Sequence, residues 1–177
     1  VVSIDDPEVG RHITDVRQMI MTLNQIQQKI YESPSVSVIE SDPFFREICL
    51  EVYYNHKADI GSVQFSFACS NVPLPGDFAL IVGLLTGELL AFLFTENRPA
   101  ASYTELSVKF SVDEDECTLL LEWAPTEIAN APSKHRELLV HDSRNQFISL
   151  LIDMIDGTVI SGGSKSSVKV RFPYVSG

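Results

Sequence analysis

The sequence predicts an α+β fold, a two-layer α/β sandwich in which helices cover one face of a mixed β-sheet. The composition of the 177-residue chain, with 45% hydrophobic and 21% charged residues, is that of an ordinary globular domain. A long apolar segment lies in the middle of the chain, and segments with strand-like alternation lie on both sides of it. Segments with helical and strand periodicity are interspersed, which favours α+β over an all-α or all-β class.

Residues 1–34 are predicted to be an N-terminal dimerisation or hairpin segment, a long helix with helical periodicity over residues 8–31, that precedes the main domain, residues 35–177. Pro34 ends this helix, because proline disfavours helical geometry at the residue before it. Apolar residues recur along it at intervals of three and four, as in the seam of a coiled coil. We therefore expect a helical hairpin or a homodimer formed through this apolar stripe, which consists of Val9, Ile13, Val16, Ile20 and Leu23.

The first half of the main domain begins with a short strand candidate at residues 36–39. The sequence Ser41-Asp42-Pro43 predicts a helix start, with a capping residue followed by proline in the first turn. This helix should run to about His56, and its expected buried residues are Phe44, Ile48 and Val52, with Leu50 and Tyr53 as further candidates. Residues 63–69 alternate as a strand, and the two prolines within residues 71–76 are expected to break it.

Residues 77–97 form the central element of the prediction. From Phe78 to Phe94 the segment is apolar almost throughout, with a single carboxylate, Glu88, near its middle. Seventeen residues are at the lower limit of a membrane span, and an acidic residue at the centre together with the lack of a flanking basic cluster argues against one. A helix that is hydrophobic on all sides is otherwise a central core helix, which is the interpretation we adopt.

The second half is predicted to contain two hairpins and a helix. Residues 106–112 alternate, an acidic turn follows, and residues 117–123 read as a second apolar strand, so the two strands should pair with each other. Residues 124–136 form a long proline- and alanine-rich loop of the length typical of a functional lid. Asp142 should open a helix that ends at Asp156-Gly157, and residues 158–161 and 166–172 should form the closing hairpin.

Charge and cysteine content restrict the classes of function. A net charge of −11 argues against nucleic-acid binding, which needs clustered lysine and arginine, and suits basic protein partners. The three cysteines are far apart in apolar segments, so we interpret them as free buried thiols in a reducing, cytoplasmic environment. No signal peptide is recognisable, and a chain without an initiator methionine is expected to be part of a longer protein.

The order of these elements and their junctions resembles the ATP-binding domain of bacterial sensor histidine kinases. The wider superfamily (GHKL or Bergerat-type ATPases) includes gyrase, MutL and the large heat-shock chaperone ATPases. The resemblance is closest to the subgroup in which a two-helix phosphoacceptor hairpin leads directly into the ATPase domain. It covers most of the chain, and the segments that carry it are residues 17–33, 42–53, 72–94 and 147–172.

The resemblance also implies that the nucleotide motifs have been lost. The central helix of the family carries a glutamate and, four residues later, an asparagine that binds Mg²⁺; here these positions are Glu88 and Phe92. The aspartate that accepts from the adenine amino group falls at about Trp123. The two glycine-rich segments fall at residues 125–127 and 141–146, the latter containing Arg144, and neither contains glycine. Phe92 offers no oxygen to a hard cation and Trp123 cannot accept a hydrogen bond.

Several candidate site residues also have an interpretation that involves no catalytic or ligand role. Glu88 is the one retained candidate for a catalytic acid or base, and it can equally be a buried carboxylate with a structural partner. His12 could be a phosphoacceptor, but the resemblance places this helix second in the hairpin, so we favour an ordinary surface histidine. His135 and His141 lack a second ligand pair at metal spacing, so no metal site is predicted.

The expected function is therefore that of a two-component signalling module. In this interpretation a catalytically degenerate, histidine-kinase-like domain dimerises and docks to a response-regulator-type protein, with no cofactor bound. One alternative is an active but divergent kinase that uses ATP and Mg²⁺. Another is a histidine phosphotransferase, in which a histidine upstream of Val1 receives phosphate and the ATPase-type domain only supports docking.

Overall fold

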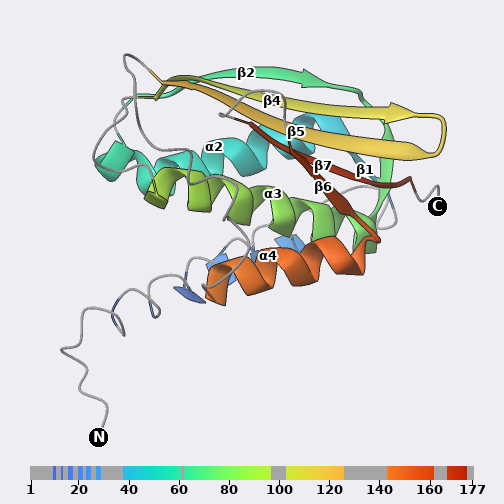
Figure 1. The fold of residues 1–177 in the computed structure, drawn as a ribbon, viewed down its shortest axis with the longest axis horizontal. Helices are drawn as coiled ribbons and strands as arrows, with labels where there is room; N and C mark the ends of the chain where they lie inside the picture. Colours follow the sequence, from blue (N-terminus) through green and yellow to red (C-terminus); the bar gives the residue numbers. More distant parts are fainter. Residues whose placement is uncertain are drawn as a thin grey trace, which may run out of the picture.

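The computed structural model describes residues 38–60, 62–96, 103–125, 143–161 and 167–174, together with ten residues between positions 10 and 28 that are all helical. Within these residues the chain forms one layer of sheet and one layer of helices, as Figure 1 shows. The predicted α+β sandwich with helices on one face of a mixed sheet is therefore confirmed.

The main sheet has five strands in the order β2-β4-β5-β7-β6. Strand β2 pairs with β4 in parallel, and all the other neighbours are antiparallel. Both predicted hairpins are present, the first joining β4 and β5 and the second joining β6 and β7. The strands span Gln64–Cys69 (β2), Tyr103–Asp113 (β4), Glu116–Pro125 (β5), Thr158–Ser161 (β6) and Ser167–Pro173 (β7).

Three helices cover one face of this sheet (Figure 1): α2 (Ser41–Ile60), α3 (Gly76–Glu96) and α4 (Ser143–Met154). Helix α2 continues four residues beyond its predicted end at His56. Phe44, Ile48, Val52 and Tyr53 are buried as expected. Leu50 is wrongly placed among the buried candidates, because its position on the helix leaves it 38% exposed on the outer flank of α2.

Helix α3 is the centre of the core, as predicted. Its residues from Ala79 to Phe94 are buried almost without interruption, since α2 and α4 pack on either side of it and the sheet lies against it. The helix is long and apolar enough to cross a membrane, but 78% of that apolar stretch is buried inside the domain. One buried hydroxyl, that of Thr86, is satisfied within the helix, where it donates to the Val82 carbonyl at 2.8 Å.

A second, two-stranded sheet was missed by the sequence prediction. Strand β1 (Val38–Glu40) pairs antiparallel with β3 (Pro73–Pro75), and Ile39 faces Leu74 in the register. Both central residues are buried and add to the core. The prolines predict a break because they cannot donate to a ladder, but in a three-residue edge strand they can occupy positions that need no donor.

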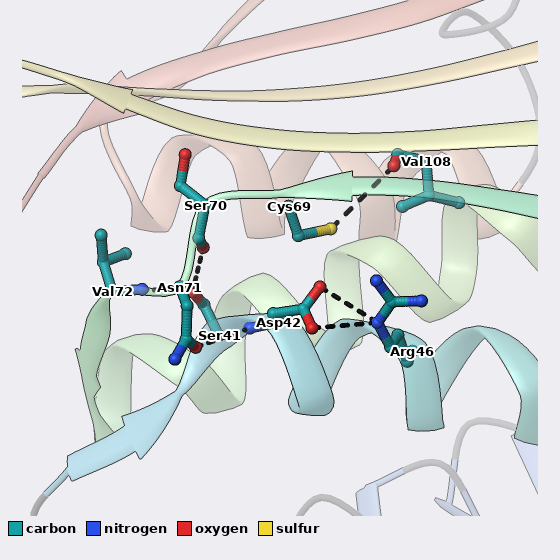
Figure 2. Close-up of polar contacts among 8 residues, drawn as sticks. All are labelled: Ser41, Asp42, Arg46, Cys69, Ser70, Asn71, Val72 and Val108. Carbon is teal, nitrogen blue, oxygen red and sulfur yellow. Dashed lines mark hydrogen bonds and ion pairs between the residues drawn. The ribbon is translucent and has the colours of Figure 1, made fainter.

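Ser41 joins the start of α2 to the connection between β2 and β3. Its hydroxyl donates to the Ser70 carbonyl at 2.7 Å and accepts from the Val72 amide at 2.9 Å (Figure 2). The Ser41 amide in turn donates to the Val72 carbonyl at 3.1 Å. The side chain is fully buried, and these bonds satisfy both its donor and its acceptor capacity. The predicted helix start is confirmed, and its serine also fixes a tertiary junction.

The predicted end of the last helix at Asp156-Gly157 is also confirmed. Asp156 has a φ of 50°, in the left-handed region, and the Gly157 amide donates to the Ile152 carbonyl at 2.8 Å. A Cβ atom at Gly157 would lie 3.1 Å from that same carbonyl oxygen. The close approach of the backbone therefore explains why glycine occupies this position.

The turn between β4 and β5 stores strain that can be released by substitution. Glu114 has a φ of 53°, which costs a side-chain-bearing residue about 1 kcal/mol or more and costs glycine almost nothing. Glu114→Gly should therefore raise the free energy of unfolding by about 0.5–1 kcal/mol in urea denaturation. The matched control is Asp115→Gly in the same turn, where φ is not positive and glycine should be neutral or destabilising. Equal effects of the two substitutions would contradict the strain argument.

The described residues of the N-terminal segment are helical, as predicted. Ile13, Val16 and Ile20 of the apolar stripe are 57%, 53% and 52% exposed in the single chain. Leu23, at the end of the stripe, packs against the hydrophobic core of the domain. Val9 lies outside the described residues, so the structure places three exposed members of the stripe and one that contacts the core.

Candidate nucleotide-binding site

Glu88 and Phe92 lie one turn apart on α3, so the helical period places them on the same side of the helix. Both are buried, with 3% of Glu88 and 9% of Phe92 exposed. Each makes contacts within the fold. Among the described side chains of α3, the carboxylate of Glu88 is the one acidic group in the core, while Phe92 contributes a hydrocarbon ring.

Trp123 and Arg144 lie on two other elements that flank α3. Trp123 is near the end of β5, opposite Leu106 of β4 in the register, and Arg144 is in the first turn of α4. The end of β5, the last turns of α3 and the first turn of α4 are at the same end of the molecule, on the left of Figure 1. The elements that carry Phe92, Trp123 and Arg144 therefore have these ends on one side of the molecule, whereas Glu88 lies in the middle of α3. The side chains of Trp123 and Arg144 are outside the described part of the chain.

The residues present on α3 do not fit a magnesium site. Mg²⁺ binds oxygen ligands in near-octahedral geometry, and the phenyl ring of Phe92 supplies none. A single carboxylate, Glu88, would have to hold the ion alone on this helix. Among the described residues there is also no group of three or more histidine, cysteine, aspartate or glutamate side chains that could hold a metal.

His56 is a buried polar residue that the sequence analysis treated only as a helix end. It is 7% exposed on α2, and its Nδ1 lies 2.9 Å from the Val52 carbonyl one turn earlier. The centre of its ring lies 5.7 Å from that of Phe94 on α3, with the two ring planes tilted by 49°. The residue therefore packs between α2 and α3. Its burial could have been predicted from the sequence, because it lies two turns beyond Cys49 on the buried face of α2.

The cysteine thiols are not arranged for nucleophilic catalysis. Burial raises the pKa of Cys49 strongly and that of Cys117 to about 12, and it also raises the pKa of the half-buried Cys69. A thiol must ionise to act as a nucleophile, so these shifts favour the inert form at neutral pH. All three are free, as the sequence analysis expected, although Cys69 is only partly buried.

The three histidines considered as phosphoacceptor or ligand candidates, His12, His135 and His141, lie outside the described residues. The same holds for residues 126–142, which contain most of the predicted lid. The candidate site that the structure describes therefore consists of the α3 side chains and the backbone positions on β5 and α4.

Comparison with solved structures identifies the architecture. No protein-family model and no curated protein matches the chain. A blue-light activated histidine kinase from Erythrobacter litoralis matches with a TM-score of 0.71 at 14% identity, over 90% of this chain. This chain has the fold of a histidine-kinase catalytic domain. The chain spans about half, 54%, of the length of that kinase.

Two further solved structures support the assignment of the histidine-kinase fold. The histidine kinase domain of the same Erythrobacter litoralis protein matches with a TM-score of 0.62 at 14% identity, over 89% of this chain and 73% of that one. The Acinetobacter baumannii histidine kinase AdeS matches with a TM-score of 0.56 at 13% identity, over 94% of this chain and 78% of that one. The resemblance inferred from the sequence is thus confirmed at the level of the fold.

Proposed function

We propose that this chain is a signalling module of two-component type whose histidine-kinase-like domain has lost ATP chemistry. The observation that carries the proposal is Phe92, which occupies the magnesium-ligand position of the family motif and is buried in the core at 9% exposure. A buried ring at this position cannot coordinate the ion, and without the ion the charge of the triphosphate stays uncompensated.

The losses at the other positions of the motif add to this effect. The adenine acceptor position corresponds to Trp123, whose indole has no acceptor, and the two segments that should be glycine-rich contain no glycine. Each lost hydrogen bond to a polar ligand group typically weakens binding by about 1–3 kcal/mol. Two or three such losses would turn a micromolar site into a millimolar one, since about 1.4 kcal/mol corresponds to a tenfold change in affinity.

Without nucleotide chemistry, the module would act through protein contacts in the cytoplasm. We propose homodimerisation through the stripe Val9, Ile13, Val16, Ile20 and Leu23, because the three central residues expose apolar side chains in a single chain. The proposed partner is a response-regulator-type protein. The net charge of −11 favours partners with a basic docking face.

Calorimetric titration of the full chain with ATP and Mg²⁺ tests the loss of nucleotide binding. We expect no saturable heat below about 1 mM nucleotide, for the reasons of affinity given above. A catalytically active histidine-kinase domain titrated in the same buffer is the positive control. A micromolar binding isotherm for this chain would disprove the proposal.

The retained glutamate favours one second candidate, an active but divergent kinase. Glu88 keeps the acidic position of the motif and lies buried at 3% exposure, where a carboxylate can serve as a general base. This candidate requires ATP binding, so the same titration separates it from the degenerate module. If binding were found, Glu88→Gln should abolish phosphate transfer while leaving nucleotide affinity within about twofold.

A further inference from the structure

Strand β2 is an open edge of the main sheet. It pairs only with β4 among the described strands, over the six residues Gln64–Cys69 without a bulge. Edge strands are usually protected by charged side chains, proline, a bulge or very short length. The opposite edge, β6, is only four residues long, whereas β2 has the sequence QFSFAC, with no charge and no proline.

The direction of the outward backbone groups follows from one hydrogen bond. The Ser70 amide donates to the Phe110 carbonyl of β4 at 2.8 Å. Residues of a parallel strand point their amide and carbonyl groups alternately to one neighbour and to the other. Ser66 and Ala68 therefore point toward β4, while the amides and carbonyls of Phe65, Phe67 and Cys69 point to the open edge.

One flank of helix α2 runs beside this edge. Arg46, Leu50, Tyr54 and Lys57 recur at intervals of four, four and three residues and form what we call the α2 flank. At one end the Arg46 guanidinium lies 4.8 Å from the centre of the Phe67 ring. Toward the other end the ring of Tyr53, beside the flank, lies 5.6 Å from that of Phe65. The flank and the outward-facing residues of β2 thus form one surface.

The middle of this surface is apolar and exposed. Leu50 is 38% exposed and Tyr54 is 65% exposed, and the stacked rings of Phe65 and Phe67 on β2 are only partly buried. An additional strand beside β2 would place every second side chain over these groups. It would gain both backbone hydrogen bonds and apolar burial, the combination used in peptide recognition by strand addition.

The charges of the α2 flank indicate what kind of segment this surface can bind. Arg46 is paired with Asp42 at 3.0 Å in a half-exposed ion pair (Figure 2). Lys57 lies 6.0 and 5.9 Å from the ring centres of Tyr53 and Tyr54, and the described part of the chain gives it no carboxylate partner. Lys57 is therefore the cation of the flank that is available to a carboxylate of a bound segment.

We propose that the open edge of β2 and the α2 flank, which carries Arg46 and Lys57 although the whole chain has a net charge of −11, bind an extended, acidic segment of a partner protein by β-strand addition, a partner other than the basic one proposed above. Alternate apolar side chains of that segment cover Phe65, Phe67 and Tyr54, and a terminal carboxylate reaches Lys57. The inference rests on the sheet edge and the helix flank alone, so it holds or fails separately from the loss of ATP binding proposed above.

A synthetic peptide provides the probe: acetyl-Glu-Thr-Val-Thr-Val-Thr-Val-Glu-amide, titrated into the full chain and followed by NMR amide exchange. We expect saturable binding and slowed exchange of the Phe65, Phe67 and Cys69 amides. The same peptide with N-methyl groups at alternate residues should bind at least about tenfold more weakly, since several ladder hydrogen bonds are lost. A peptide with lysine in place of both glutamates should also bind more weakly.

Variants of the protein locate the site. Lys57→Glu should weaken binding of the acidic peptide about fivefold and reduce the preference over the lysine peptide. Phe67→Ala removes the ring but keeps the outward amide, and Phe67→Pro removes both, so the proline variant should bind more weakly than the alanine variant. If the proline variant does not fold, the N-methylated peptide makes the same test on the unmodified chain.

Three outcomes would overturn the inference. The first is no saturation up to about 1 mM peptide, which is weaker than a useful recognition site. The second is binding that N-methylation of the peptide leaves unchanged, because strand addition requires the backbone. The third is concentration-dependent protection of the three amides in the chain alone, with no effect of peptide, which would assign the edge to a second copy.

Discussion

Phe45→Ala is expected to lower the free energy of unfolding by about 3–5 kcal/mol, the typical cost of removing a buried phenylalanine. Phe45 is fully buried on α2, with its ring 4.6 Å from that of Phe110 on β4 and 5.7 Å from that of Phe44. Phe110 in turn lies 6.5 Å from Phe172 on β7. The truncation therefore leaves a cavity where helix α2 meets the centre of the sheet.

Urea denaturation followed by circular dichroism measures this loss. The matched control is Leu50→Ala on the same helix, which removes an apolar side chain that is 38% exposed and should cost less than about 1 kcal/mol. Both substitutions change helix propensity little, so the difference reports the burial of Phe45. Equal losses for the two variants would show that α2 does not pack on the sheet as described.

Replacing Ile13 and Ile20 together by aspartate is expected to abolish self-association of the chain. The two side chains are 57% and 52% exposed in the single chain, so they are available to a second helix. In the proposed dimer the substitution would place four carboxylates in an apolar seam, and burying even one unpaired charge costs several kcal/mol. Sedimentation velocity should show a dimer for the unmodified chain and a monomer for the variant.

The control for this experiment keeps the added charge and changes its position. Gln18→Asp with Gln25→Asp adds the same two carboxylates to the same helix, at positions that the helical period places opposite the stripe. This variant should remain dimeric, and both variants should show the same urea midpoint for the main domain. A monomeric unmodified chain, or a dimer that survives in the stripe variant, would contradict the proposed interface.

The main elements were predictable because each has a strong local signal. The apolar run of α3 exceeds what a surface helix can expose, so its central position follows from composition alone. The alternation in β4 and β5 and the acidic turn between them predict a hairpin, and the register agrees with that pattern. Asp156-Gly157 predicts the end of α4 through the same backbone geometry that the structure contains.

What was missed depends on contacts between residues far apart in the chain. The pairing of β1 with β3 places Val38 opposite Pro75. Each of these strands has only three residues, which is too short for a local pattern that would predict the pairing. The hydrogen bonds of Ser41 to Ser70 and Val72 likewise span about thirty positions, so the sequence shows only a helix cap. Leu50 fits the periodicity of a buried residue, but its exposure is decided by α2 lying at the edge of the helical layer.

For the candidate site, the sequence predicts the relative placement of two residues on α3, and the assignment of the site itself stays a prediction. The spacing of four between Glu88 and Phe92 fixes their common side of α3, and both are found buried. Which end of the sheet faces them depends on the order β2-β4-β5-β7-β6, in which β7 lies between the sequence neighbours β5 and β6. The α2 flank was not recognised because its four residues satisfy no known motif, although their spacing was visible in the sequence.

The topology also sets the order in which the chain can mature during its synthesis. Helix α3 is complete at Glu96, whereas β4, β5, β7 and β6 all begin at or after Tyr103. The ribosome therefore synthesises an almost wholly apolar helix before it synthesises four of the five strands of the sheet that covers it. Strand β2 cannot pair at this stage either, because its parallel partner β4 is synthesised only after that helix. Until the β4–β5 hairpin emerges, the nascent chain presents its most hydrophobic segment to the chaperones that meet it.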